Sequence, residues 1–226
     1  MERLQAAPDQ TGPDSLLSHW SLVYRPLAKN RGRRPALFLD RDGVIIEDVN
    51  YISDPNDVQL IPGVGETIRH FRSAGFTVVV VTNQSGIARG YFDRDAYLRV
   101  ERRIRELLAA DEPDAVYACP FHKDGRPPYN VEHPWRKPSD GMLRASSVAL
   151  GIDLKKSLMV GDSLSDIQAA TAAGVARAFH VLTGHGRMHR AKVEQLCETL
   201  DTRAPSSTQV SCVDSIATVF SAFQAS

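Results

Sequence analysis

The stretch Leu39-Asp40-Arg41-Asp42-Gly43-Val44 follows a short apolar run, residues 36–39. Continuous apolar runs of this length are typical of strands that are covered on both faces. Two carboxylates two residues apart at a strand end point the same way, and Gly43 lets the backbone turn away sharply. Their mutual repulsion favours a hard divalent cation with oxygen ligands, and Mg2+ is the best fit. Taken alone, however, Asp-x-Asp-Gly is also a common turn sequence.

Outward from this stretch, short apolar runs alternate with segments of helical period. The runs predict strands at residues 36–39, 77–81, 115–118, 157–160 and 178–182, and helices are predicted at 64–74, 94–110, 140–150 and 164–173. This alternation predicts an α/β fold, a doubly wound, Rossmann-like parallel sheet with helices on both faces and right-handed crossovers. Ligands of such sheets bind beyond the carboxyl ends of the strands.

Other predicted strand ends also carry polar groups. The run Thr82-Asn83-Gln84-Ser85-Gly86 offers a hydroxyl, amides and backbone N–H groups, which suit an anionic oxygen. Arg136 and Lys137 end a long loop just before a predicted helix, and Gly161-Asp162-Ser163-Leu164-Ser165-Asp166 supplies a second acid pair on a glycine turn. The sequence therefore predicts one polar rim built from two acid pairs, a hydroxyl and two cations.

The order and spacing of these motifs resemble the haloacid-dehalogenase-like superfamily, whose motifs are an Asp-x-Asp, a Ser or Thr, a Lys and a final acidic pair. The corresponding residues here are Asp40 and Asp42, Thr82, Lys137, and Asp162 with Asp166, over about residues 36–185. The runs at 38–43, 82–90, 119–120 and 136–138 resemble more closely the D-glycero-D-manno-heptose 1,7-bisphosphate 7-phosphatases and the related histidinol-phosphatases. The resemblance implies a Mg2+-dependent phosphatase of a small sugar phosphate or bisphosphate.

Carried over residue by residue, the resemblance implies that Asp40 attacks phosphorus to form an aspartyl-phosphate, a covalent route that splits hydrolysis into two easier steps. Asp42 then protonates the departing alkoxide and activates water, while Thr82 and Lys137 hold the transferred oxygens. By the same resemblance, Mg2+ is held by Asp40, the Asp42 carbonyl and Asp162. Asp166 supports the Lys137 amine or a metal-bound water. The implied substrate contacts are Asp48, Val49, Asn50, Tyr51, Asn83, Gln84, Ser85 and Arg136.

The long loop at residues 119–138 departs from the family pattern. The family's zinc site there has the form Cys-x-His and then Cys-x-Cys, whereas this chain has Cys119-Pro120-Phe121-His122 and His133-Pro134-Trp135. Phe and Trp replace two of the four ligands, and a structural zinc needs four donors. We therefore expect no ordinary structural zinc, with an irregular Cys119, His122 and His133 site as the only route. Proline and aromatic packing are expected to shape the loop.

The composition limits the partners and the compartment. The chain has 226 residues with 27 Lys+Arg and 27 Asp+Glu, so its formal net charge is zero. It also lacks the stripe of basic residues that would predict nucleic-acid binding. No apolar run approaches the length of a membrane span, and three scattered cysteines favour a reducing compartment. We expect a cytoplasmic, monomeric enzyme whose partner is a small phosphorylated metabolite.

The domain organisation follows from the same length, which supports one α/β domain plus tails. We expect an N-terminal arm at 1–34, a phosphatase core at 35–186, and a C-terminal extension at 187–226 packed on the core. The core carries the loop insert 119–138 instead of a full cap domain.

Two alternative functions are compatible with the predicted fold. Histidinol phosphate or another small phosphomonoester is the alternative substrate for the same site. Ser163 stands where the heptose enzymes usually have Lys, which removes a cation near the phosphate and leaves the substrate open. A non-catalytic binding module that keeps the fold belongs to a different class. The presence of both Asp40 and Asp42 argues against it.

Overall fold

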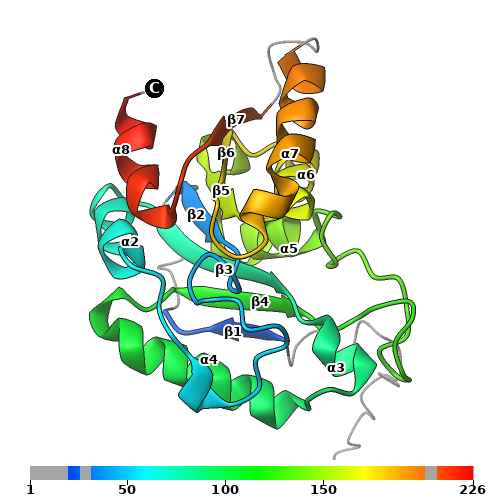
Figure 1. Cartoon of the computed structure of the whole chain (residues 1–226). Coiled ribbons are helices and arrows are strands. Elements are labelled where there is room, and N and C mark those ends of the chain that lie inside the picture. Colours follow the sequence, from blue (N-terminus) through cyan, green and yellow to red (C-terminus); the bar gives the residue numbers. More distant parts are fainter. Residues whose placement is uncertain (1–19, 26–31, 202–207, 226) are drawn as a thin grey trace, which may run out of the picture.

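The sheet is the centre of the computed structural model, which describes residues 20–25, 32–201 and 208–225 (Figure 1). The described residues form seven strands in the order β1-β4-β3-β2-β5-β6-β7. Their bounds are Ser21–Val23 (β1), Ala36–Leu39 (β2), Thr77–Asn83 (β3), Ala115–Cys119 (β4), Leu158–Gly161 (β5), Arg177–His180 (β6) and Gln209–Cys212 (β7). β2 to β7 pair in parallel, and β1 alone runs antiparallel, against β4. The predicted α/β class is confirmed.

Helices cover both faces of this sheet. Their bounds are Val64–Ser73 (α2), Ser85–Arg89 (α3), Arg94–Leu108 (α4), Gly141–Leu150 (α5), Leu164–Ala173 (α6), Gly186–Asp201 (α7) and Val219–Gln224 (α8). Short 3-10 turns occur at Pro55–Asp57, Ala109–Asp111, Leu154–Lys156 and Ile216–Thr218. All four helices predicted between the strands are present, each within two residues of the expected bounds.

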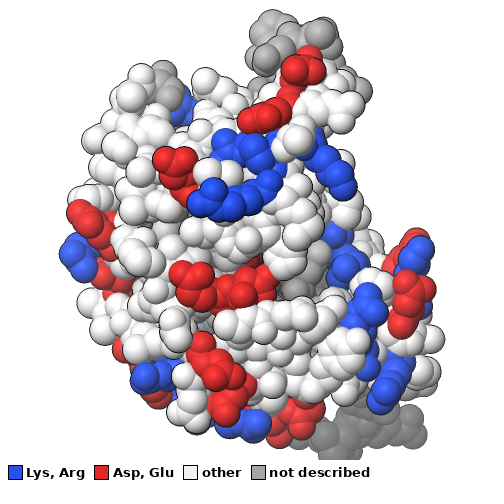
Figure 2. Space-filling model, viewed as in Figure 1, with Lys and Arg blue, Asp and Glu red and all other residues white. Residues whose placement is uncertain are grey.

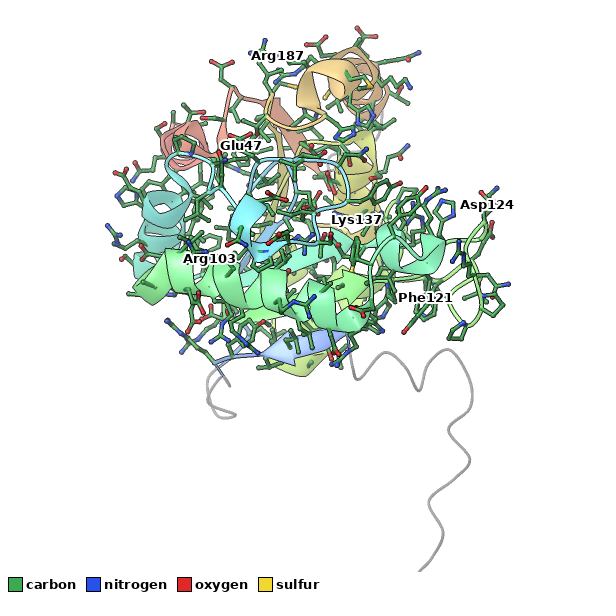
Figure 3. The ribbon with its side chains drawn as sticks, turned by 60° about the horizontal axis from the view of Figure 1, so that its bottom comes forward. Glu47, Arg103, Phe121, Asp124, Lys137 and Arg187 are labelled. Carbon is green, nitrogen blue, oxygen red and sulfur yellow. The ribbon has the colours of Figure 1, made fainter. Side chains whose placement is uncertain are left out.

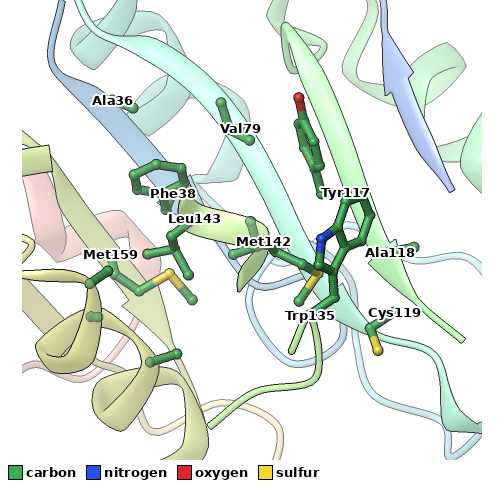
Figure 4. Close-up of a cluster of buried hydrophobic side chains, with 14 of the residues drawn as sticks. Ala36, Phe38, Val79, Tyr117, Ala118, Cys119, Trp135, Met142, Leu143 and Met159 are labelled. Carbon is green, nitrogen blue, oxygen red and sulfur yellow. The ribbon is translucent and has the colours of Figure 1, made fainter. Parts of the chain in front are cut away.

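Alternation along the strands creates two apolar cores, because successive side chains point to opposite faces. Phe38 and Val79 pack in one buried cluster with residues of α5 and α6, whereas Leu37 and Val78 pack in the other with residues of α2 and α4. The first cluster surrounds Met142 of α5 (Figure 4). Strands buried on both faces are thus fixed in register, and the carboxyl ends of β2, β3 and β5 lie at one edge.

The N-terminal segment joins the sheet, a feature that the sequence did not predict. Its β1 pairs Leu22 with Val116, and the backbone oxygen of Trp20 accepts a 2.9 Å hydrogen bond from the Ala118 N–H. Trp20 is buried, with its ring 5.5 Å from that of Tyr97. The rest of the predicted arm, residues 1–19 and 26–31, lies outside the described residues.

The insert at 119–138 contains no helix or strand beyond Cys119, within the part of the chain that is described. Aromatic rings pack it: Phe121 stacks on His133 with ring centroids 4.5 Å apart, and Trp135 lies 5.5 Å from Tyr117 of β4. One backbone bond, from the Arg126 N–H to the Ala88 oxygen at 2.6 Å, ties the insert to α3. In Figure 3, Asp124 marks its outer tip, far from Lys137 near the centre.

No described helix combines the length and the apolar character that crossing a membrane requires.

Candidate active site

The centre of the site is a buried lysine between carboxylates, and together Asp40, Lys137, Asp162 and Asp166 are called the strand-end cluster below. Lys137 Nζ lies 2.9 Å from Asp40 Oδ1 and 2.6 Å from Asp166 Oδ1. It also donates a 2.8 Å hydrogen bond to the backbone oxygen of Val81. With its side chain 1% exposed, Lys137 has little freedom to leave this position. The parallel sheet thus brings together residues that are far apart in the sequence, such as Asp40 and Lys137.

The electrostatics of the strand-end cluster follow from its burial. Burial raises the pKa of Asp40 to about 7, against the opposing effect of Lys137. Burial, together with the charges of Asp40 and Asp166, raises the pKa of Asp162 to about 8. Burial alone lowers the pKa of Lys137, but Asp166 and Asp40 more than offset it, so the net shift is upward. Lys137 therefore stays protonated, and the carboxylates retain more negative charge than it balances.

A divalent cation fits this excess of negative charge. Carboxylate oxygens of Asp40, Asp162 and Asp166 lie within 4.8 Å of one another, close enough to meet around one ion. Oxygen ligands at such spacing suit Mg2+, which keeps some of its waters and binds few protein carboxylates. Both carboxylate oxygens of Asp166 are already bonded, Oδ1 to Lys137 and Oδ2 to Ser163, whereas Lys137 contacts Asp40 through Oδ1. Asp40 and Asp162 are therefore the better placed ligands.

Two glycines hold Asp162 from opposite segments of chain. A Cβ atom at Gly43 or at Gly184 would lie 2.3 Å from Asp162 Oδ2, so neither position has space for a side chain. Both glycines have positive φ, +83° and +53°, which other residues rarely adopt. The His185 backbone N–H donates a 2.7 Å hydrogen bond to the same oxygen. The turn after β2 and the loop before α7 therefore meet at this carboxylate.

Asp166 is positioned by the start of α6. The backbone N–H of Ser163 donates to Asp166 Oδ2 at 2.9 Å, and the Ser163 hydroxyl donates to the same oxygen at 2.7 Å. This arrangement is a capping box, in which the cap residue and the third helical residue satisfy each other's polar groups. Its other oxygen, Oδ1, is left for Lys137.

The end of β3 fixes the lysine from the other side. Asn83 Nδ2 donates to the Lys137 backbone oxygen at 3.0 Å, and the Lys137 N–H donates to Asn83 Oδ1 at 3.1 Å. Gln84 Nε2 lies 2.9 Å from both Thr82 Oγ1 and Asp42 Oδ2. The two amides thus connect the hydroxyl, the lysine and the second carboxylate of the Asp-x-Asp motif.

The predicted residues are distributed over adjoining cavities. A cavity of about 200 Å³ is lined by Asp40, Asp42, Asp48, Thr82, Asn83, Lys137, Asp162, Ser163, Ser165, His185 and His189. Its neighbour, also about 200 Å³, is lined among others by Asn50, Tyr51, Gln84 and Ser85, and it shares Asp42, Asp48, Asn83 and His185 with the first. Val49 lies at a third cavity with Met188. Acidic side chains cross the centre of the corresponding face (Figure 2).

Arg136 points elsewhere than the other predicted substrate contacts. It lines a cavity of about 300 Å³ in the insert, together with His122 and His133, and does not line the first two cavities. Its Nη1 donates to the backbone oxygen of Phe121 at 3.4 Å. Burial lowers the pKa of its guanidinium. Along the chain, Lys137 of the strand-end cluster stands between Arg136 and Pro138, which both line this cavity.

His185 is a site residue that the sequence reasoning missed. Its ring Nδ1 lies 2.7 Å from Asp48 Oδ2, and the residue lines three of the cavities. The signal was available, because Thr183-Gly184-His185-Gly186 follows the predicted strand at 178–182 and strand ends were expected to carry the chemistry. Arg41, inside the Asp-x-Asp motif, was likewise overlooked; its guanidinium contacts Asp42 at 3.0 Å.

The irregular zinc route depends on Cys119, His122 and His133. Cys119 is buried, and burial raises the pKa of its thiol to about 11. His122 accepts contacts from Arg89 and from the Asp124 backbone, while His133 Nδ1 accepts from the Trp135 N–H. Among the described residues, the group of carboxylates in the strand-end cluster is the one with metal-ligand spacing.

Comparison with known proteins identifies the family. A family model described as HAD-hydrolase-like matches residues 134–205. The chain is 48% identical over 150 residues to the D-glycero-beta-D-manno-heptose-1,7-bisphosphate 7-phosphatase of Mesorhizobium japonicum, covering 65% of this chain and 69% of that one. It is 39% identical over 151 residues to the protein of the same name from Haemophilus influenzae, covering 66% and 82%. The chain belongs to the haloacid-dehalogenase-like phosphatases.

A solved structure supports the same relationship for this phosphatase. The D,D-heptose 1,7-bisphosphate phosphatase from B. bronchiseptica, complexed with magnesium and phosphate, matches with a TM-score of 0.69 and 33% identity. The match covers 85% of this chain and 99% of that chain. The family and the phosphatase class predicted from the motifs are thereby confirmed.

Proposed function

We propose that this phosphatase removes one phosphate from a small sugar bisphosphate, with a heptose 1,7-bisphosphate as the first candidate. The observation that carries the proposal is the Asp40 carboxylate held 2.9 Å from Lys137 Nζ beside Asp162, on a cavity that Asp42 also lines. The names of the relatives supply the substrate class.

In the first step, a carboxylate oxygen of Asp40 attacks phosphorus and the ester P–O bond breaks, leaving an aspartyl-phosphate. The proton on Asp42 passes to the departing alkoxide, which leaves as an alcohol. Lys137 and Thr82 hold the phosphoryl oxygens as charge moves onto the leaving group. Lys137 is preset for this task, because Asp166 and the Val81 backbone fix its amine.

In the second step, Asp42, now ionised, takes a proton from a water that attacks phosphorus. The bond from phosphorus to Asp40 breaks, which regenerates the carboxylate and releases inorganic phosphate. When bound by Asp40, Asp162 and the Asp42 carbonyl, Mg2+ neutralises charge on the phosphoryl oxygens. The related structure with magnesium and phosphate supports this assignment of the metal.

The rest of the substrate is proposed to lie in the adjoining cavity. Asp48, Asn50 and Tyr51 line it from the first long loop, and Gln84 with Ser85 lines it from the end of β3. Asn50 and Tyr51 have φ of 57° and 59°, and strained backbone of this kind is common at binding sites. Hydroxyl-rich molecules suit such a polar wall. Arg136 then reaches the substrate only from the insert side.

The test is a phosphate-release assay with Mg2+ on heptose 1,7-bisphosphates, sugar monophosphates and histidinol phosphate. We expect the highest kcat/KM with a heptose bisphosphate, with no release when Mg2+ is removed by a chelator. A preference for histidinol phosphate would show that the protein is a histidinol-phosphatase and not a sugar bisphosphate phosphatase. Absence of release from every phosphomonoester would contradict the proposed function.

A further inference from the structure

Arg41 has a guanidinium that is buried beneath the site, with its side chain 2% exposed. Its Nε and Nη2 donate to both carboxylate oxygens of Asp42, at 3.2 and 3.0 Å. An arginine that grips a carboxylate along one edge fixes its plane as well as its distance. Asp42, by contrast, has a side chain 26% exposed at the cavity, so this grip is a main restraint on its rotation.

The opposite edge of the guanidinium is held from α4. Arg41 Nη1 donates a 2.9 Å hydrogen bond to Glu101 Oε1, and the Glu101 side chain is 4% exposed. The Tyr97 ring lies 5.5 Å from the guanidinium carbon. Glu101 is 60 residues away in sequence and lines none of the described cavities. Its contact with the site passes through Arg41.

Gln84 closes the network. Arg41 Nη2 donates to Gln84 Oε1 at 3.0 Å, while Gln84 Nε2 reaches Asp42 Oδ2 and Thr82 Oγ1. All three guanidinium nitrogens therefore donate to neighbouring side chains, and each bond restricts the orientation of the next. Buried networks that are fully satisfied are rigid.

From these contacts we infer that Arg41 and Glu101 are positioning residues that hold the Asp42 carboxylate for proton transfer to the leaving oxygen. The inference rests on the proposed function, in which Asp42 is the general acid. Proton transfer requires hydrogen-bond reach in the reacting geometry, so a carboxylate free to rotate donates less often. Glu101 balances the buried charge of Arg41, and it aims the Nε and Nη2 edge at Asp42.

The test compares substrates that differ in their need for an acid. The leaving group of an alkyl phosphate, such as the preferred sugar phosphate, is a strongly basic alkoxide that needs a proton. The leaving group of p-nitrophenyl phosphate is p-nitrophenolate, which departs without protonation. Arg41→Lys keeps the charge and loses the fork, and Glu101→Leu loses the acceptor. Because hydrolysis of the aspartyl-phosphate is common to both substrates, the comparison uses kcat/KM, which reports the step in which the leaving group departs. We expect each variant to lower kcat/KM for the sugar phosphate about 10- to 100-fold and for the aryl phosphate less than about 3-fold. Glu101→Gln, which keeps an acceptor oxygen, should restore most of the loss.

The controls separate this inference from its premise. Asp42→Asn should show the same dependence of kcat/KM on the leaving group; if it lowers kcat/KM equally for both substrates, the proposed role of Asp42 as general acid fails. Arg72→Lys is the matched control, since Arg72 is partly buried, bonds to Glu112 and Asp114, and lines none of the described cavities. It should leave the ratio of the two rates unchanged.

Folding is checked by the melting temperature of each variant. If Glu101→Leu does not fold, the inference is still tested by comparing the two substrates in Arg41→Lys and Glu101→Gln. With Asp42→Asn behaving as expected, an equal decrease in kcat/KM for both substrates in Arg41→Lys would show a merely structural role. Unchanged rates on both substrates would also overturn the inference.

Discussion

The strand-end cluster and the insert at 119–138 share Lys137, but they are held together by different interactions. In the cluster, ion pairs and hydrogen bonds hold charged groups, with Lys137 bonded to Asp40, Asp166 and Val81. In the insert, aromatic rings stack, as Phe121 does on His133. The fixed charges of the strand-end cluster can take part in the reaction, whereas the packed rings determine the shape of the insert. The two regions should therefore respond to mutation independently.

The largest effect is expected at Asp40. Asp40→Asn keeps the size of the side chain and removes the nucleophilic oxygen, so turnover should fall at least about 10³-fold while the fold stays intact. Phosphate release and circular dichroism measure the two halves of this expectation. Retention of a tenth of wild-type activity would exclude the aspartyl-phosphate route.

Phe121→Ala addresses the other region. Phe121 is fully buried, and its loss leaves a cavity beside His133 and Tyr129, so the free energy of unfolding should decrease by about 3–5 kcal/mol. The value of kcat for p-nitrophenyl phosphate should change little, since the strand-end cluster keeps its bonds. Urea denaturation and steady-state kinetics on one preparation test both statements. A stable variant with a collapsed kcat would show that the two regions are not independent.

Mg2+ should stabilise the protein more at pH 8 than at pH 5.5. The pKa values of Asp40 and Asp162, about 7 and 8, lie above the ordinary value near ~4. Their contribution to stability is complete below that ordinary value and is lost as the pH rises through the folded values. Mg2+ binds the ionised forms, and at a hundredfold excess over Kd it adds about 2.7 kcal/mol. Thermal shifts after chelation, with and without added MgCl2, test this; equal shifts at both pH values would contradict it.

Arg136→Ala affects the point where the two regions meet. Arg136 stands beside Lys137 but lines the cavity of the insert, so its loss should raise KM for the sugar bisphosphate about tenfold. Turnover of a generic aryl phosphate should stay near normal, whereas Lys137→Ala should damage both activities. Equal losses on all substrates in the two variants would show that the division of labour between these cations is misassigned.

The smallest expected effect is that of a zinc chelator. With Phe121 and Trp135 at two of the family's ligand positions, we expect well under one zinc per chain and no change in melting temperature on chelation. Elemental analysis of the purified protein checks the first expectation. Tightly bound stoichiometric zinc would place Cys119, His122 and His133 in a metal site after all.

The fold was largely predictable because its strands are buried on both faces. Runs such as Val78 to Val81 have a single interpretation once helical segments flank them, and strand ends of a parallel sheet share one edge. The sequence therefore predicts Asp40, Lys137 and Asp162 at one edge of the sheet, and the structure brings them together there. The helix starting at Leu164 was predicted to the residue, since Ser163 and Gly174 mark its ends locally.

Contacts made between distant segments left no local signal. Glu101 lies on a helix whose pattern explains it as one more charged position, and only the fold brings it 2.9 Å from Arg41. The β1 strand has three residues, too few for a period, and it exists because β4 offers an unpaired edge. The direction of Arg136, toward the insert, depended on the path of a loop with little periodicity.

The short strand β1 has a consequence for solubility. It covers the backbone of β4, and an uncovered strand edge is a template on which further chains pair. A shortened protein without residues 1–25 would keep every side chain of the strand-end cluster, yet it would expose Ala115 to Tyr117 along the margin of the sheet. Such a protein would fail by aggregation and not by loss of its chemistry. The short segment at residues 20–25 acts, in this sense, against self-association of the sheet.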